Sequence, residues 1–271
     1  MSFWASLLQQ GFLQNALAAS LLVSLACGVV GSFVVLKRIA FLAGGIAHGV
    51  LAGMGLAWWF GWPPLAGAVG AALAFATLLW WLTLDVRRDV EVLIAALWSV
   101  GMAAGLVLIA KAPGQNPDLM SYLFGNVLMV GREQLGWMLA LDAAILMTVA
   151  GLYPTLVATA FDEEFARLRG LPVEAARLLI LVLVALTVVL LIQVAGLILV
   201  IALLTLPAAL ARQSRSVAAM MLQASAWAAL ATVAGLWAAY RLDWPAGPTM
   251  VLAIGALYLL KRIIKRPPRA S

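Results

Sequence analysis

Uncharged apolar segments long enough to cross a bilayer follow one another along almost the whole chain. A membrane-spanning helix needs about 20 mostly apolar residues. Residues 13–36 carry no charge and end at two basic residues, and residues 39–84 are free of Asp, Glu, Lys and Arg. The second stretch is too long for one span, and the Gly-Trp-Pro-Pro sequence at 61–64 predicts a turn that divides it in two.

The rest of the chain continues this pattern with one interruption. The further predicted spans are 92–110, 135–158, two within 178–211, 217–240 and 249–260. Gly196 and Pro207 are the expected break points within the long stretch, so we expect its second helix to be bent. Residues 119–130 lie in a segment rich in Gly and Pro, and they predict a short interfacial or re-entrant helix. The total is about nine spans, or about eight if one of the shorter segments is re-entrant.

Composition supports the same conclusion. Of 271 residues, 65% are hydrophobic and 10% are charged, and the mean hydropathy is +1.08. Soluble domains are about 45–50% apolar and about 25% charged, so no soluble fold of this size could bury so much apolar surface. The sequence therefore predicts an all-α integral membrane protein, with one polytopic membrane domain over residues 1–271. It excludes a cytosolic enzyme and a nucleic-acid-binding protein. The single cysteine, Cys27, excludes a disulfide within the chain.

The basic residues indicate how the spans are oriented. Of the 17 Lys and Arg, 14 fall in one set of alternating loops and the other 3 fall in the opposite set. Loops rich in Lys and Arg stay in the cytoplasm, so the first set is expected inside, together with the C-terminus. With nine spans the N-terminus is expected outside, and residues 111–134 and 241–248 face outward.

His48 is the single histidine and lies inside a predicted span. An ionisable residue within a span is a functional candidate by default. On a helix, Gly44 and Gly45 share its face, and Gly45, Gly49 and Gly53 form a ridge that allows another helix to approach closely. Imidazole nitrogen is a favoured ligand of zinc. Two interpretations remain open: a ligand on a metal path, or a histidine hydrogen-bonded between helices.

Asp142 is the other candidate for a translocation path. It lies within the predicted span 135–158, so it either pairs with another group or lines water. The sequence contains no Walker lysine loop, no His-Glu-x-x-His zinc motif and no Gly-x-Ser-x-Gly elbow. If the protein transports a solute with ATP, another chain must bind the nucleotide.

A polar segment between two spans has the sequence pattern of a short capped helix. Asp162 suits the N-cap, acids follow in the first turn, arginines stand in the last turn, and Gly170 can end the helix. Phe161, Phe165 and Leu168 would be apolar anchors at helical spacing for a cytoplasmic partner. The alternative is an ordinary solvated connector.

Several stretches, in order from about residue 15 to 260, resemble the membrane permease subunit of zinc/manganese-type ABC importers. They are Lys37–Phe41 leading to Ala47-His48, Asp118–Gly125, Phe161–Gly170, Ala195–Ala209 and Gly247–Thr249. The Tyr-Leu-Phe-Gly run at 122–125 and the Ala-Leu-Leu-Thr-Leu-Pro-Ala-Ala run at 202–209 are the most specific of these.

The resemblance implies a type II ABC importer permease fold, related to that of the cobalamin importer, in a bacterial cytoplasmic (inner) membrane. It implies a homodimer embedded in membrane lipid. A cytoplasmic ABC ATPase subunit would carry the ATP and dock on a coupling helix at about 160–172. An extracytoplasmic solute-binding protein would deliver a divalent metal. No permanently bound cofactor and no nucleic acid are expected.

The resemblance also implies a metal-path pair of the form Asp-x-x-x-His. This chain has His48 but carries Gly44 where the Asp is expected. Imidazole without carboxylate suits zinc better than manganese, so zinc ranks first, with manganese and iron as alternatives.

Three other functions can be compared with this one from the residues. A permease for a larger metal chelate, such as a siderophore or cobalamin, would share the architecture and would need no metal ligands. A secondary transporter would need coupling ions at broken helices, and no inverted repeat is apparent in the sequence. A membrane-embedded enzyme would need clustered acids or histidines, for which one histidine and one deep aspartate are too few.

Overall fold

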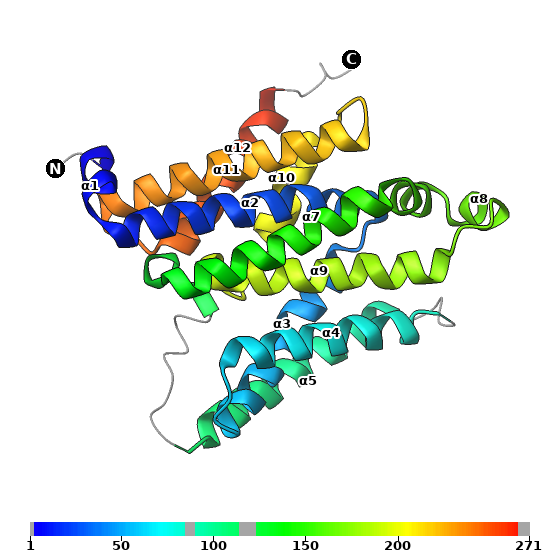
Figure 1. Cartoon of the computed structure of the whole chain (residues 1–271), viewed down its shortest axis with the longest axis horizontal. Helices are drawn as coiled ribbons and strands as arrows, with labels where there is room; N and C mark the ends of the chain where they lie inside the picture. Colours follow the sequence, from blue (N-terminus) through cyan, green and yellow to red (C-terminus); the bar gives the residue numbers. More distant parts are fainter. Residues whose placement is uncertain (1–2, 85–89, 114–122, 265–271) are drawn as a thin grey trace, which may run out of the picture.

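Helices form nearly all of the chain in the computed structural model, which describes residues 3–84, 90–113 and 123–264 (Figure 1). Within these ranges no strand occurs, and eight helices are long and apolar enough to cross a membrane. This confirms the prediction of an all-α integral membrane protein. The eight helices are α2 (Gly11–Lys37), α3 (Ala40–Trp59), α4 (Pro64–Leu82), α5 (Val90–Lys111), α7 (Arg132–Phe161), α9 (Val173–Ala195), α11 (Val217–Leu242) and α12 (Ala246–Ile264).

Four shorter helices complete the described part: α1 (Phe3–Gln9), the 3₁₀ helix η1 (Val127–Met129), α8 (Glu163–Leu168) and α10 (Val200–Ala211). The twelve residues of α10 rise about 18 Å at 1.5 Å per residue, which is less than the roughly 30 Å of a bilayer core. The second helix predicted within 178–211 is therefore a short one. The pattern of apolar residues did not predict α1.

The predicted breaks are right at Gly196 and wrong at Pro207. Gly196 ends α9 with φ 76°, a conformation that side chains other than glycine rarely adopt. Pro207 lies inside α10, which continues to Ala211. A proline within a helix removes one backbone hydrogen bond, and α10 remains helical on both sides of Pro207. In α7 a kink at Leu152 precedes Pro154.

The turn predicted between the second and third spans is present. Gly61 has φ 70°, Pro63 caps α4 and Pro64 is its first residue, where a proline loses no helical hydrogen bond.

The helix predicted at 119–130 is not continuous. Residues 119–122 lie outside the described residues. Leu123 and Phe124 are helical, residues 125 and 126 are not, and η1 follows. Gly125, with φ 74°, interrupts the segment. The backbone N–H of Ile198 donates to the carbonyl of Leu123 at 3.2 Å, so this segment packs across the end of α9.

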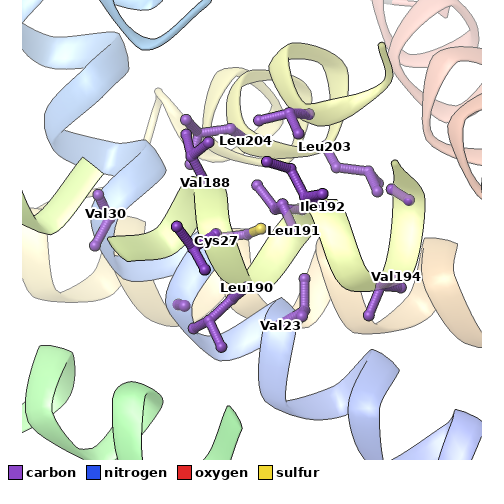
Figure 2. Close-up of a cluster of buried hydrophobic side chains, with 14 of the residues drawn as sticks. Val23, Cys27, Val30, Val188, Leu190, Leu191, Ile192, Val194, Leu203 and Leu204 are labelled. Carbon is purple, nitrogen blue, oxygen red and sulfur yellow. The ribbon is translucent and has the colours of Figure 1, made fainter. Parts of the chain in front are cut away.

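The helices form two groups (Figure 1). In one, α3 packs tightly against α4 and α5, and in the other, α2 packs against α7, α9, α10 and α11. The two groups meet chiefly where α9 contacts α3 and α4. Figure 2 shows the centre of the second group, where Val23 and Cys27 of α2 lie among Leu190 and Leu191 of α9 and Leu204 of α10.

Candidate functional site

His48 lies in the middle of α3 and is buried against Trp98 of α5. The two rings stack with centroids 3.9 Å apart and planes inclined by 29°. The Nδ1–H of His48 donates to the carbonyl of Gly44 at 2.9 Å, since a carbonyl oxygen can only accept. In the neutral ring this leaves the lone pair on Nε2, which is the atom that could bind a metal ion. The stack and the hydrogen bond together fix the orientation of the imidazole.

The space beside Gly44 is filled by side chains of other helices. A Cβ at this position would lie 2.8 Å from Cδ1 of Ile201 in α10 and 3.1 Å from Cζ3 of Trp98. A carboxylate at position 44 would have to displace both neighbours. The close packing around Gly44 is therefore consistent with the absence of the aspartate that the Asp-x-x-x-His pattern requires at this position.

The glycine ridge of α3 lies against α4 and α5. A Cβ at Gly49 would lie 2.6 Å from Cε1 of Phe75, and one at Gly45 would lie 2.9 Å from Cγ2 of Ile94. A Cβ at Gly53 would overlap Ala71 and the backbone of α4. Small residues at these positions let the three helices approach closely, and this close packing supports the part of α3 that carries His48.

Asp142 is buried on α7, and its Oδ1 has no hydrogen-bond partner among the described residues. It faces α2 near Ala26, whereas His48 stands on α3. Helices α3 and α7 share no substantial contact surface. The structure therefore does not bring the two predicted path residues into one cluster. Within the described ranges no group of three His, Cys, Asp or Glu side chains is placed to hold a metal ion.

The segment predicted to form a capped helix does so. Helix α8 runs from Glu163 to Leu168, and the N–H of Phe165 donates to Oδ1 of Asp162 at 2.9 Å. Gly170 follows with φ 74°, so the chain turns sharply before α9 begins.

Large apolar side chains are exposed at the end of α7 and on α8. Phe161 is 67% exposed, Phe165 is 49% exposed and Leu168 is 83% exposed. Apolar side chains on a short helix that connects two spans, outside the apolar segments, are typical of a surface that another protein covers.

Ion pairs tie α8 to the two spans beside it. Lys37, the last residue of α2, lies 2.5 Å from Glu163 and also donates to the carbonyl of Thr159 at 3.2 Å. Arg177 of α9 lies 3.9 Å from the same carboxylate. Arg167 and Arg177 both contact Glu174, at 3.0 Å and 3.3 Å. Helix α8 is thus anchored to the ends of α2 and α9.

Sequence reasoning missed Trp98 and the pairing of Lys37 with Glu163. Trp98 stands in an apolar span where a tryptophan is common, and neither the basic loop pattern nor the resemblance gives Lys37 a partner. The opposite charges of Lys37 and Glu163, both near span ends, are the one signal that could have suggested the ion pair. The spacing of the residues does not indicate that Trp98 stacks on His48.

Comparison with known proteins gives one consistent answer. The ABC 3 transport family pattern matches residues 9–265. An uncharacterized membrane protein of Synechocystis sp. is 41% identical over 96% of this chain and 92% of its own length. The manganese transport system membrane protein MntC of Halalkalibacterium halodurans is 31% identical, over 95% of this chain and 89% of its own.

A solved structure agrees with these relatives. PsaBC from Streptococcus pneumoniae, in complex with a Fab, superposes with a TM-score of 0.87 and 31% identity, over 95% of this chain and 93% of that one. The similarity thus covers all the described helices that position His48 and α8. The chain is a multi-pass bacterial membrane protein that belongs to the ABC 3 transport family.

Proposed function

We propose that the chain is the membrane permease subunit of an ATP-driven importer of divalent metal ions. Relatives that match almost the full chain are named as metal or manganese transport proteins, which supports a metal as the substrate class. The sequence contains no Walker lysine loop, and we assign ATP hydrolysis to a separate ATPase subunit. The permease works as a homodimer with a path between its two copies, and an extracytoplasmic solute-binding protein delivers the metal.

Zinc is the metal that the chemistry around His48 favours. The Nε2 lone pair is the available ligand atom, and Gly44 supplies no carboxylate beside it. Imidazole suits zinc, whereas manganese prefers carboxylate oxygens. The names of the relatives favour manganese instead. The single observation that carries the choice of zinc is the imidazole held between Trp98 and the Gly44 carbonyl with no carboxylate at position 44.

The ATPase docks on Phe165 and Leu168 of α8, together with Phe161 at the end of α7. These side chains are exposed in the single chain, and burying them in a partner's groove would stabilise the complex by the hydrophobic effect. Helix α8 is too short to be stable alone. Its N-cap and its ion pairs hold it in place, and a pull on α8 is therefore passed to the spans.

The route from α8 to His48 is short. Glu163 holds Lys37 at the end of α2, and only Arg38 and Ile39 separate α2 from α3. When ATP closes the ATPase dimer, the displaced α8 moves the end of α2 and the start of α3. Rocking of α3 then switches the path from outward to inward access, and His48 offers a passing ligand rather than a storage site.

Metal uptake in a deletion strain tests the proposal. Cells that lack the gene are complemented with the wild-type protein or with His48→Ala at equal protein levels, and uptake of zinc, manganese and iron is compared. We expect zinc uptake to be restored by the wild type and reduced at least about tenfold by His48→Ala, as the loss of a ligand predicts. Restoration of manganese uptake alone would make manganese the substrate, and normal zinc uptake with His48→Ala would remove His48 from the path.

A further inference from the structure

A cavity of about 390 Å³ lies at the end of α2, beside the connection to α3. The ends of α4 and α7 and the beginning of α9 complete its walls, so it lies where the spans reach the side of the membrane that carries α8. It is separate from His48 in the middle of α3.

The charges around the cavity favour an anion. Lys37, Arg38 and Arg177 line it, and Glu163 is the only acidic side chain among its described lining residues. Lys37 and Arg177 share that one carboxylate, and Arg177 also pairs with Glu174, which does not line the cavity. Arg38 has no ion pair within the part of the chain that the structure describes. The described lining therefore carries three positive charges against one negative charge.

Two further features supply hydrogen-bond donors or positive potential. Helix α3 begins at the cavity wall, where Ile39 and Leu42 line it, and no side chain caps this helix. The positive end of its dipole therefore faces the same region. Thr159 also lines the cavity, its side chain is fully buried, and its hydroxyl has no hydrogen-bond partner among the described residues. A buried hydroxyl without a partner is costly unless a ligand satisfies it.

Most of the remaining lining is apolar. Leu36, Leu42, Ile180 and Leu181 contribute to it from helices that enter the bilayer, and Ile39 contributes from the connection between α2 and α3. A free inorganic anion would gain nothing from these side chains, but an acyl chain attached to a charged headgroup would pack on them. Basic pockets between spans on the cytoplasmic side are suited to anionic lipid headgroups.

We propose that this cavity binds an anionic phospholipid. Arg38 is the main positively charged side chain that contacts its phosphate, and the part of an acyl chain next to the glycerol packs against the leucines and isoleucines. The site shares Phe161 and Glu163 with the segment proposed to dock the ATPase, but lipid binding there needs neither the metal nor the ATPase. The lipid would brace the connection between α2 and α3 on the same side as α8. The proposal therefore stands or falls separately from the proposed transport function.

Lipid retention by the purified full-length protein tests this. The protein is placed in nanodiscs that contain equal amounts of phosphatidylcholine and phosphatidylglycerol, and the lipids that stay bound after transfer to mild detergent are counted by native mass spectrometry. We expect the wild type to retain phosphatidylglycerol in preference to phosphatidylcholine. Arg38→Gln should lower this retention about fivefold, the effect of one basic residue near an anionic headgroup, and Arg38→Lys should preserve most of it.

Arg215→Gln is the matched control, because Arg215 is an exposed arginine that does not line the cavity; its retention should equal that of the wild type. Equal retention by Arg38→Gln and the wild type overturns the proposal. A different result would be that inorganic phosphate protects the wild type, but not Arg38→Gln, against thermal unfolding, with no preferential retention of phosphatidylglycerol. That result would identify a site for a soluble anion and also overturn the proposal. If Arg38→Gln retained lipid like the wild type but no longer co-purified with the ATPase, the cavity would bind an acidic side chain of that partner instead.

Discussion

Lys37 at the end of α2 and Glu163 at the start of α8 form an ion pair with 2.5 Å between Nζ and Oε1. The lysine side chain is only 14% exposed and also holds the carbonyl of Thr159 in α7. One side chain thus joins three helices at the point where the proposed ATPase surface meets the spans. Because α3 begins three residues after Lys37, this pair connects α8 to the chain segment that leads into the helix carrying His48.

Breaking this pair should uncouple transport more than it destabilises the fold. Lys37→Gln and Glu163→Gln should each lower stability by about 1 kcal/mol, since the glutamate is partly exposed and water screens the pair. Metal uptake per ATP hydrolysed should fall several-fold, while ATPase co-purification persists because the apolar face of α8 is intact. The measurements are uptake and hydrolysis in proteoliposomes that contain the complete transporter.

The charge-exchanged protein Lys37→Glu/Glu163→Lys is the control for this experiment. It should recover part of the uptake that either single reversal loses. If both Gln variants transported as much metal per ATP as the wild type, the pair would have no part in coupling.

Trp98 should act as a positioning residue for His48. Trp98→Phe keeps a flat ring on the imidazole and should retain most of the zinc uptake, whereas Trp98→Ala removes the stack and should raise the zinc concentration for half-maximal uptake more than it lowers the maximal rate. The comparison separates orientation of the ligand from general loss of fold, because a folding defect would reduce the maximal rate through protein level. Identical concentration dependence for the alanine variant and the wild type would contradict this role.

Restoring the aspartate of the Asp-x-x-x-His pattern should require a second change. Gly44→Asp alone places its Cβ 2.8 Å from Cδ1 of Ile201, and overpacking of this kind costs about 1–3 kcal/mol. Ile201→Ala opens the space, so Gly44→Asp/Ile201→Ala should be better folded than Gly44→Asp. The added carboxylate should shift the preference from zinc toward manganese, as measured by competitive uptake of the two metals. An unchanged preference in a well-folded double variant would show that position 44 does not contact the metal.

The exposed apolar face of α8 should be needed for ATPase binding. Phe165→Ala or Leu168→Ala should each weaken co-purification of the ATPase about tenfold, as is typical of a buried apolar anchor in an interface. Leu8→Ala in α1 is the matched control, because Leu8 is 80% exposed at the opposite end of the span α2. Strong co-purification with both α8 variants would mean that the ATPase docks elsewhere.

Gly196 should tolerate no side chain. Its φ of 76° is combined with a ψ of 168°, a region open almost only to glycine, and its Cβ would overlap the backbone at Gly125. Gly196→Ala should therefore lower stability by about 1–3 kcal/mol or more. Gly136→Ala in α7 is the control, since nothing lies within 4 Å of its added methyl group, and helix propensity favours the alanine. Thermal unfolding in detergent would compare the two, and equal midpoints would contradict the assigned strain.

The spans were predictable because length and lack of charge are sufficient to specify them, and α8 was predictable because Asp162 and Gly170 are local end signals. The length of α10 was not predictable. An uncharged stretch such as 178–211 has the same pattern whether it forms two full spans or one full span and one short helix, and Pro207 looked like a break although its helix continues. Local backbone geometry, not hydropathy, decides between these outcomes.

The candidate site was predictable only in part. His48 was recognisable because an ionisable residue within a span is unusual, and the small residues around it were visible at helical spacing. The partners of these residues were not, since Trp98 reaches His48 and Lys37 reaches Glu163 only through the packing of helices far apart in the sequence; the second pair is separated by 126 positions. Hydropathy also does not indicate which uncharged helices become neighbours. The sequence therefore offers both His48 and Asp142 as path residues, although their helices do not pack against each other.

Cys27 lies among the leucines and valines shown in Figure 2 and is only 1% exposed. Thiol reagents in water will not reach it in the folded protein, and the chain has no other cysteine. Spectroscopic labels can therefore be attached at engineered surface cysteines without first removing the native one. Distances between helices can thus be measured on an otherwise unaltered sequence.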